Sequence, residues 1–253
     1  MILDLFRLDG QVAVITGGNR GLGLGIARAL AEAGAHIVSI QLSRDTPDLA
    51  QAIAATGRDL LSLPLDITHE DAAQRALDAT LTRFGRADIL VNNAGVQRRH
   101  PADQFPLADF DRVIEVNLRA VFQFCQTFGV HMLAQSHGKI INVASLLSFQ
   151  GGITVPAYAA SKHALAGLTK ALSNEWAARG VNVNAMAPGY MDTDMNVALK
   201  ADAERKQAIN TRIPAGRWGQ PEDVGGLAVF LASRASDYVH GQIIGVDGGW
   251  LAR

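Results

Sequence analysis

Tyr158 and Lys162 are residues whose types and spacing indicate a chemistry. They stand one helical turn apart in Tyr-Ala-Ala-Ser-Lys, so a helix would place both side chains on one face. A phenol with an ordinary pKa of about 10 is a poor acid or base at neutral pH, but an adjacent ammonium favours the phenolate. The pair therefore predicts proton exchange with the oxygen of an alcohol or a carbonyl.

Ser145 precedes this pair by twelve intervening residues and closes an apolar run that is typical of a buried strand. Its hydroxyl could donate a hydrogen bond to the same substrate oxygen, which would orient the substrate and stabilise developing charge. A carbonyl held in this way could accept hydride on its carbon. Because Tyr-x-x-x-Lys alone is only fair evidence, this interpretation depends on a second motif.

A glycine-rich segment near the start of the chain supplies that motif. Residues 16–23, Thr-Gly-Gly-Asn-Arg-Gly-Leu-Gly, follow an apolar strand and open a helix. Gly17 permits a tight turn, Gly21 and Gly23 let the backbone approach a pyrophosphate, and the helix N-terminus presents N–H groups to the anion. An ordinary glycine-rich turn is the alternative. The position after the first strand favours a dinucleotide site, and the missing Gly-Lys-[Ser/Thr] ending disfavours a kinase or ATPase.

The end of the second predicted strand bears on the choice between NAD(H) and NADP(H). An acidic side chain there usually holds the ribose hydroxyls in an NAD-specific site, but this chain has Gln41. Arg20 in the loop and Arg44 after the strand could face a 2′-phosphate, or they could be solvated surface cations. The sequence leaves both cofactors open.

Alternating strands and helices must position these groups. Short β-branched and apolar runs alternate with longer segments of helical periodicity, which is typical of stacked βαβ units. The predicted strands are residues 12–16, 36–41, 60–64, 89–92, 139–143, 181–185 and 242–246. The predicted helices are residues 22–33, 47–56, 69–84, 107–135, 156–179 and 221–233. We therefore expect an α/β fold with one doubly wound, seven-stranded parallel sheet and helices on both faces.

The chain shows no linker, low-complexity tract or internal repeat, so residues 1–253 are expected to form one domain. Residues 191–214, between the last two strands, are expected to be a mobile lid over the substrate. A formal net charge of -1 gives no electrostatic case for nucleic acid. No run of about 18 apolar residues occurs, so no membrane span is expected. The single Cys125 fits a reducing compartment, and we expect a cytoplasmic protein.

Residues from the whole chain together resemble the short-chain dehydrogenase/reductase family. The resemblance is carried by residues 16–23, Asn92-Asn93-Ala94-Gly95, Asn117, Ser145, Tyr158, Lys162 and Pro188-Gly189. It implies a Rossmann-like domain that binds NAD(H) or NADP(H). It further implies that Tyr158 is the acid–base group, that Lys162 lowers its pKa and binds the nicotinamide ribose, and that Ser145 orients the substrate. Asn117 would hold a water of a proton relay from a local kink in its helix.

The same resemblance implies which residues contact the cofactor. Asp66 would meet the adenine, Asn92 would support the central strand, and Met191 and Thr193 would meet the nicotinamide carboxamide. The full expected set is Gly17, Asn19, Arg20, Gly21, Leu22, Gly23, Gln41, Asp66, Ile67, Asn92, Ala94, Gly95, Tyr158, Lys162, Pro188, Gly189, Met191 and Thr193. No metal site is expected, because the histidines are scattered and no two-cysteine metal pair occurs.

The loops at the carboxyl ends of the strands must select the substrate. Arg98 and Arg99 follow Asn-Asn-Ala-Gly directly, and a guanidinium can hold a carboxylate with two hydrogen bonds, although exposed arginines are more often solvated. Residues 145–152, 212–219 and 246–253 resemble a group in the family that acts on ring-opened sugar acids. This implies a substrate of the 2-keto-3-deoxygluconate or 2-deoxygluconate type. Arg98, Arg99, Ser145, Gln150 and Tyr158 would contact it.

Other functions remain possible on the sequence. A 3-oxoacyl thioester reductase would use the same chemistry, although the chain has no obvious basic cluster for an acidic carrier protein. A dinucleotide-binding protein without activity would not need the complete catalytic set. A hydrolase is disfavoured because no Gly-x-Ser-x-Gly occurs. The family resemblance also implies a homotetramer assembled through the long helices at 107–135 and 156–179.

Overall fold

A seven-stranded sheet lies at the centre of the molecule, in the order β3-β2-β1-β4-β5-β6-β7. The computed structural model describes residues 1–44 and 46–253. All neighbouring strands pair in parallel, which confirms the predicted sheet. The strands are β1 (Val12–Thr16), β2 (His36–Gln41), β3 (Leu60–Pro64), β4 (Ile89–Asn92), β5 (Gly138–Val143), β6 (Val181–Pro188) and β7 (Ile243–Val246).

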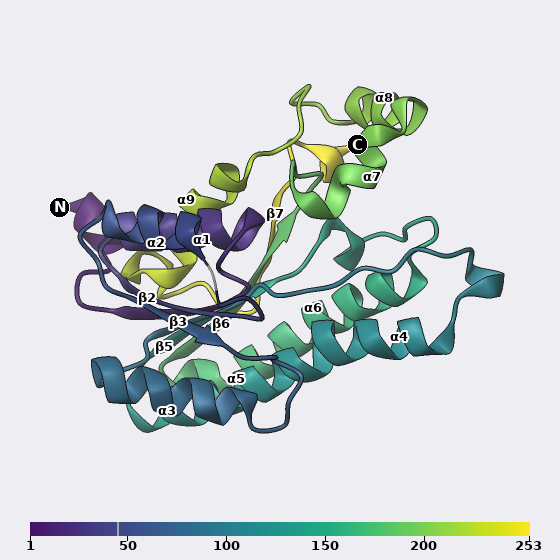
Figure 1. Ribbon diagram of the computed structural model, residues 1–253. Helices are drawn as coiled ribbons and strands as arrows, with labels where there is room; N and C mark the ends of the chain where they lie inside the picture. Colours follow the sequence, from purple (N-terminus) through teal and green to yellow (C-terminus); the bar gives the residue numbers. More distant parts are fainter. Residues whose placement is uncertain (45) are drawn as a thin grey trace.

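Helices cover both faces of this sheet (Figure 1). One face carries α1 (Gly21–Glu32), α2 (Pro47–Ala54) and α9 (Gly225–Ala232). The other face carries α3 (Ala72–Phe84), α4 (Leu107–Ile114), α5 (Ala120–Ala134) and α6 (Pro156–Trp176). Two short helices, α7 (Val197–Ala201) and α8 (Ala203–Arg212), stand apart from both layers near the C-terminus.

Each strand contributes to two hydrophobic cores because successive side chains point to opposite faces. In β1, Val12 and Val14 pack in the core that contains Phe124 and Phe128 of α5. Ala13 and Ile15 of the same strand belong to the core under α1 and α9. Burial on both faces explains why the strands read as continuous apolar runs, and each fully buried large side chain contributes about 1.5–3 kcal/mol.

The strand order reverses next to β1, and this reversal creates the space for a site. The chain passes from β1 to β2 and β3 on one side, and β4 then pairs with β1 on the other. The loops after β1 and β4 therefore leave the sheet in diverging directions. A crevice forms between them at the carboxyl ends of the strands.

The largest differences between the observed and the predicted elements lie in three places. The helix predicted at 107–135 is interrupted by a π-helical turn, Glu115–Arg119, which separates α4 from α5. β6 continues to Pro188, because Met186–Pro188 pair with β7 beyond the predicted end at 185. Residues 191–214 contain α7 and α8, which the sequence interpretation treated only as an insertion. Within the described residues, no helix has the length and apolarity needed to cross a membrane.

Candidate active site

A cavity of about 1250 Å³ occupies the crevice at the carboxyl ends of the strands. Most of the predicted site residues line it. These are Gly17, Asn19, Arg20, Gly21, Leu22, Gly23, Gln41, Asp66, Ile67, Ala94, Gly95, Arg98, Arg99, Ser145, Gln150, Tyr158, Lys162, Pro188, Gly189, Met191 and Thr193. Asn92 and Asn117 do not line the cavity, and their side chains contact neighbouring residues instead.

The glycine loop between β1 and α1 has the geometry of an anion site. Gly17 has a φ of 67°, which favours glycine. A Cβ on Gly23 would overlap the Gly17 carbonyl oxygen, so a side chain there would push α1 away from the loop. Arg20 provides no side-chain cap at the start of α1. The first N–H groups of α1 therefore lack a capping side chain, as a bound pyrophosphate would require.

Thr16 and Asn93 connect the loops after β1 and β4. The Thr16 hydroxyl accepts hydrogen bonds from the backbone N–H groups of Asn93 and Ala94, each at 3.0 Å. The Asn93 amide donates to the carbonyl oxygens of Thr16 at 2.9 Å and Gly17 at 3.0 Å. The sequence interpretation quoted both residues within motifs but gave neither a role. Their positions at the ends of neighbouring strands are the signal that could have identified them.

Gln41, at the end of β2, presents a hydrogen-bond donor rather than an acid. The side chain is buried, and its Oε1 accepts a hydrogen bond from the Ser39 hydroxyl at 2.5 Å. Its buried Nε2 has no hydrogen-bond partner among the described residues. Since Gln41 lines the cavity, this orphaned donor fits an oxygen of a bound nucleotide.

Asp66 follows β3 on the same side of the cavity. Its Oδ1 accepts hydrogen bonds from the backbone N–H of Thr68 at 3.0 Å and from the Thr68 hydroxyl at 2.8 Å. The bond from the Thr68 backbone is the largest cause of a lowered pKa of Asp66, and Arg112 adds to the lowering. The carboxyl is therefore held ionised and oriented at the edge of the cavity.

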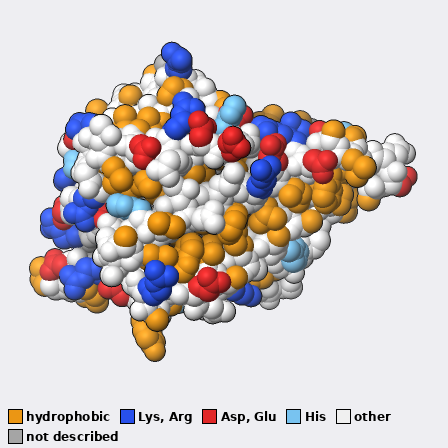
Figure 2. Space-filling view, turned by 90° about the horizontal axis from the view of Figure 1, so that it is seen from below, with side chains coloured by type: hydrophobic (Ala, Val, Ile, Leu, Met, Phe, Trp, Pro, Cys, Tyr) orange, Lys and Arg blue, Asp and Glu red, His pale blue; other side chains and the backbone are white. Residues whose placement is uncertain are grey.

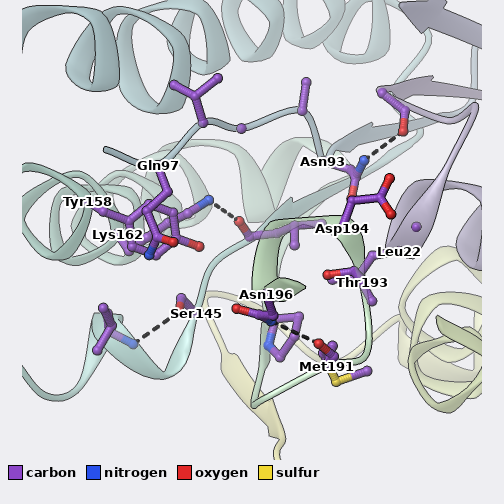
Figure 3. A pocket seen from close by; sticks show the side chains of 18 of the residues that line it. Leu22, Asn93, Gln97, Ser145, Tyr158, Lys162, Met191, Thr193, Asp194 and Asn196 are labelled. Carbon is purple, nitrogen blue, oxygen red and sulfur yellow. Dashed lines mark hydrogen bonds between the residues drawn. The ribbon is translucent and has the colours of Figure 1, made fainter. Parts of the chain in front are cut away.

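The Tyr158 and Lys162 side chains lie together on one side of the cavity, as their spacing on α6 predicts (Figure 3). The Lys162 Nζ donates a hydrogen bond to the Val143 carbonyl oxygen at 2.7 Å and lies 5.6 Å from the centroid of the Tyr158 ring. Burial lowers the pKa of Lys162 to about 8. Met191, Thr193 and Asp194, which follow β6, lie on the opposite side.

Several neighbours act on the pKa of Tyr158. Burial raises the pKa of its phenol, while a hydrogen bond with Ser145 and the charge of Arg99 oppose that rise. The Lys162 ammonium donates to the Val143 carbonyl oxygen and lies close to the phenol ring. Arg99 is therefore a second cation beside the phenol, and the sequence interpretation gave it only a substrate role.

Ser145 is oriented by the start of a short helical turn at Leu146–Ser148. Its Oγ accepts a hydrogen bond from the backbone N–H of Leu147 at 3.2 Å. This bond uses only an oxygen lone pair, so the hydroxyl hydrogen can point toward Tyr158. Ser145 can therefore donate to an oxygen atom placed between it and Tyr158.

Asn117 and Asn92 are buried beside the cavity and hold the backbone in place. Asn117 lies in the π-helical turn, where its Nδ2 donates to the Val96 carbonyl oxygen at 2.9 Å and its Oδ1 accepts from the Val96 N–H at 2.8 Å. Asn92 donates to Asn142 Oδ1 at 2.9 Å within the sheet. The expected kink is present at Asn117, and its amide ties the loop after β4 to the helix.

Two neighbouring arginines differ sharply in their surroundings. Arg98 is exposed, and its Nε lies 3.4 Å from Asp109 Oδ1. Arg99 is half-buried, and its Nη2 donates to Gln97 Oε1 at 3.0 Å. Burial lowers the pKa of Arg99, with Arg205 as the second cause. Of the two, Arg99 is therefore the one without an acidic partner in the described part of the chain.

Two aromatic side chains, Tyr190 and Trp250, line the cavity near Gln150. The Trp250 Nε1 donates to Gln150 Oε1 at 3.2 Å, and the Tyr190 ring centroid lies 4.7 Å from that of Trp250. Arg212 lies over the Trp250 ring at 4.0 Å. The sequence interpretation gave no site role to Tyr190, Arg212 or Arg205. All three follow β6, in a segment where no spacing of residue types marked them.

Comparisons with known proteins agree with this architecture. A family model described as enoyl-(acyl carrier protein) reductase matches residues 17–251. The 2-dehydro-3-deoxy-D-gluconate 5-dehydrogenase of Bacillus subtilis is 52% identical over 250 residues, covering 99% of this chain and 98% of the relative. A solved structure of a gluconate 5-dehydrogenase from Burkholderia cenocepacia, in complex with NADP and tartrate, is 44% identical, covers 100% of both chains and has a TM-score of 0.95.

A further solved structure comes from Agrobacterium tumefaciens, is assigned as a 2-deoxy-D-gluconate 3-dehydrogenase and contains bound NADP. It is 51% identical, covers 99% of this chain and 100% of its own, and has a TM-score of 0.93. Both the family match and these identities extend over nearly the whole chain. The chain belongs to the short-chain dehydrogenase/reductase family.

Proposed function

We propose that the protein is an NAD(P)-dependent oxidoreductase that transfers hydride between the nicotinamide and a secondary alcohol or ketone of a small sugar acid. The substrate is of the 2-keto-3-deoxygluconate or 2-deoxygluconate type. The observation that carries the proposal is that Tyr158, Ser145 and the half-buried Arg99 line one cavity with the glycine loop. The names of the similar dehydrogenases support the choice of a sugar acid.

The residues of the cavity fit NAD(H) or NADP(H). The N-terminus of α1 and the loop from Gly17 to Gly23 would bind the pyrophosphate, Gln41 would donate to the adenosine ribose or its phosphate, and Asp66 would meet the adenine. Met191 and Thr193 would hold the carboxamide opposite Tyr158. When bound, the cofactor supplies the hydride acceptor or donor, and the positive charge of the oxidised nicotinamide favours the phenolate.

The side chains of the protein handle the proton and the substrate oxygen. In the oxidative direction the Tyr158 phenolate accepts the hydroxyl proton of the substrate, while Ser145 donates a hydrogen bond to the same oxygen. In the reductive direction the Tyr158 phenol returns that proton to the oxygen of the reduced carbonyl. Lys162 would bind the nicotinamide ribose, and the charge of Arg99 opposes the rise that burial causes in the pKa of Tyr158.

Asn117 positions a water molecule that connects Lys162 with solvent. Its side-chain amide is occupied by Val96 and Ser161, so the water would bind the backbone rather than the amide. The π-helical turn Glu115–Arg119 interrupts the regular carbonyl series of the helix at this point and would offer such an acceptor.

A reductase acting on 3-oxoacyl thioesters is the second candidate. The matched family model carries the description of an acyl-carrier-protein reductase, which favours it. The two candidates share the acid–base group and the cofactor. They differ in the substrate end of the cavity, where a half-buried guanidinium suits a small anion better than an acyl chain.

The decisive experiment follows formation of reduced nicotinamide by its near-ultraviolet absorbance. The purified protein is incubated with 2-keto-3-deoxygluconate, 2-deoxygluconate or an acetoacetyl thioester, with NAD(H) and NADP(H) separately. We expect turnover of a sugar acid, reduced at least about 100-fold in Tyr158→Phe. Tyr238→Phe is the matched control because Tyr238 is fully exposed. Turnover of the thioester alone would replace the first candidate by the second.

The whole chain, in this proposal, is one cofactor-binding domain in which residues 191–214 close over the substrate, and it acts in the cytoplasm as a homotetramer. Figure 2 shows the face seen from below, where apolar side chains gather over the lower helix layer. On α5, Phe122 and Val130 are exposed. The exposed positions of α6 include Ala160, Ala164 and Ala171, which would let a second helix approach closely.

A further inference from the structure

Arg205 of α8 is a charged residue of the cavity that has no role in the proposed proton transfer. It is half-buried, and it lines the cavity together with Arg212 at the end of the same helix. Its Nε is fully buried and has no hydrogen-bond partner among the described residues. A guanidinium normally uses its N–H groups when it is buried, so Arg205 keeps an unused donor.

Arg99 and Arg205 repel each other across the cavity. After burial, the charge of Arg205 is the largest cause that lowers the pKa of Arg99, which means that the two guanidinium groups are close enough to interact. Two like charges that are partly removed from water destabilise each other unless an anion lies between them. The α8 segment thus places a second cation where the loop after β4 already supplies one.

Three other arginines of the cavity pair with carboxylates, whereas Arg212 lies over the Trp250 ring and the Lys162 ammonium donates to the Val143 carbonyl oxygen. Arg98 pairs with Asp109 at 3.4 Å, Arg112 with Glu115 at 2.8 Å, and Arg20 with Asp194 at 3.7 Å. In the described part of the chain, neither Arg99 nor the Arg205 side chain has a carboxylate partner. The unbalanced positive charge is therefore concentrated at the substrate end.

We propose that Arg99 and Arg205 form a two-arginine clamp that binds the carboxylate of the substrate between the loop after β4 and helix α8. The inference rests on the proposed function and adds Arg205 as a specificity-determining residue. Each guanidinium can offer two parallel N–H donors to a carboxylate, which suits this anion geometrically. Arg99 interacts electrostatically with Tyr158 and Tyr190 as well, so the bound carboxylate lies near the acid–base group.

The clamp would favour closure of residues 191–214 over the bound substrate. Arg99 lies in the loop after β4, whereas Arg205 lies on α8, which stands apart from both helix layers (Figure 1). A bound carboxylate replaces the repulsion between the two arginines by two attractions. Substrate binding therefore stabilises the position of α8, and a neutral substrate analogue does not.

The test compares Arg205→Gln with Lys206→Gln, a matched control on an exposed neighbour of the same helix that does not line the cavity. Steady-state constants are measured for the sugar acid, for its neutral amide and for the cofactor. We expect Arg205→Gln to raise KM for the acid about tenfold or more, which corresponds to a loss of about 1.4 kcal/mol. KM for the amide and for the cofactor should change less than about twofold, and Arg205→Lys should recover part of the loss.

A binding measurement separates the clamp from the proposed function. Gluconate is titrated into the protein with NADP present, and the signal is the tryptophan fluorescence, to which Trp250 at the cavity contributes. The wild type and Lys206→Gln should bind it with equal affinity, and Arg205→Gln about tenfold more weakly. Equal affinity in Arg205→Gln, or equal losses for acid and amide, would overturn the clamp. A wild type that binds gluconate but turns over no sugar acid would overturn the proposed function and leave the clamp standing.

Discussion

Burial acts in opposite directions on the pKa values of the two central residues of the site. It lowers the pKa of Lys162 to about 8 and raises the pKa of Tyr158. Both shifts favour the neutral forms, so the phenolate needs stabilisation from elsewhere. In the structure this comes from the Ser145 hydroxyl and from Arg99. The acid–base function therefore depends on neighbours that are distant in sequence, and not on Lys162 alone.

The buried ammonium of Lys162 predicts a pH-dependent stability. Its pKa falls from 10.5 in the unfolded chain to about 8 in the folded one, so the unfolded state binds more protons between these values and stability rises with pH there. Relative to Lys162→Met, the wild type should gain up to about 3 kcal/mol between pH 8 and 10.5. Urea unfolding of both proteins across this range measures the difference. Parallel pH profiles would contradict the shift.

Gln41 predicts how the protein selects its nicotinamide cofactor. Its buried Nε2 can donate to an oxygen of either nucleotide, so we expect kcat/KM for NAD and NADP to agree within about tenfold, or 1.4 kcal/mol. Gln41→Asp adds a carboxylate that accepts from ribose hydroxyls and repels a 2′-phosphate. It should lower kcat/KM for NADP at least about tenfold more than for NAD. An unchanged ratio in kinetic assays would exclude contact between this position and the 2′-phosphate.

Helix α1 owes its position to the glycines of the preceding loop. Gly23 allows the first turn of α1 to lie against the Gly17 carbonyl, and Asn93 donates to that same oxygen. The pyrophosphate site is thus built from backbone groups held by contacts between β1, α1 and the loop after β4. Adding one methyl group inside this contact should weaken cofactor binding more than adding one at an uncrowded position of another helix.

Gly23→Ala and Gly226→Ala form a matched pair that tests this contact. The added Cβ overlaps the Gly17 carbonyl in the first variant, whereas nothing lies within 4 Å of it in the second. We expect Gly23→Ala to weaken NADP binding at least about tenfold, or 1.4 kcal/mol, and to lower the free energy of unfolding. Gly226→Ala, at an exposed helix position, should stabilise by about 0.5–1 kcal/mol. Calorimetry would contradict the interpretation if both variants bound NADP like the wild type.

At the scale of the whole molecule, the outer surface of the layer with α5 and α6 bears on the proposed assembly. The layer with α5 and α6 carries exposed apolar side chains, and the two helices lie against each other where Trp176 fills the space above Gly129. Phe122 and Val130 remain uncovered on α5. An apolar surface over long, closely packed helices is the kind of face through which identical subunits pair about a two-fold axis.

Val130→Glu combined with Ala164→Glu tests the proposed assembly. Both positions are exposed in the single chain, so the substitutions should leave its fold intact while placing charges in an apolar interface. We expect light scattering to show a tetramer for the wild type and a smaller species for the double variant. Tyr238→Glu, at a fully exposed position, is the control. A monomeric wild type would contradict the proposal directly.

Much of this architecture could be predicted from local patterns in the chain. The runs that became β1, β2, β3 and β4 were predicted with their observed bounds. β1 and β4 are mostly apolar because they are buried on both faces, whereas β3 is a half-buried edge strand. The spacing of Tyr158 and Lys162 determined their common helix face, since helical geometry depends only on neighbouring residues. The glycine loop was recognisable because a turn against a helix N-terminus needs glycine at particular positions.

The tertiary structure alone decided how these parts influence one another. The approach of Arg205 to Arg99, the raised pKa of Tyr158 and the donor left unpaired on Gln41 all arise from residues brought together by the sheet and the crossing helices. Burial and charge act through space, over a few ångströms, and the sequence records only separation along the chain. The sequence therefore identified the acid–base group, whereas only the tertiary structure showed which neighbours shift its pKa.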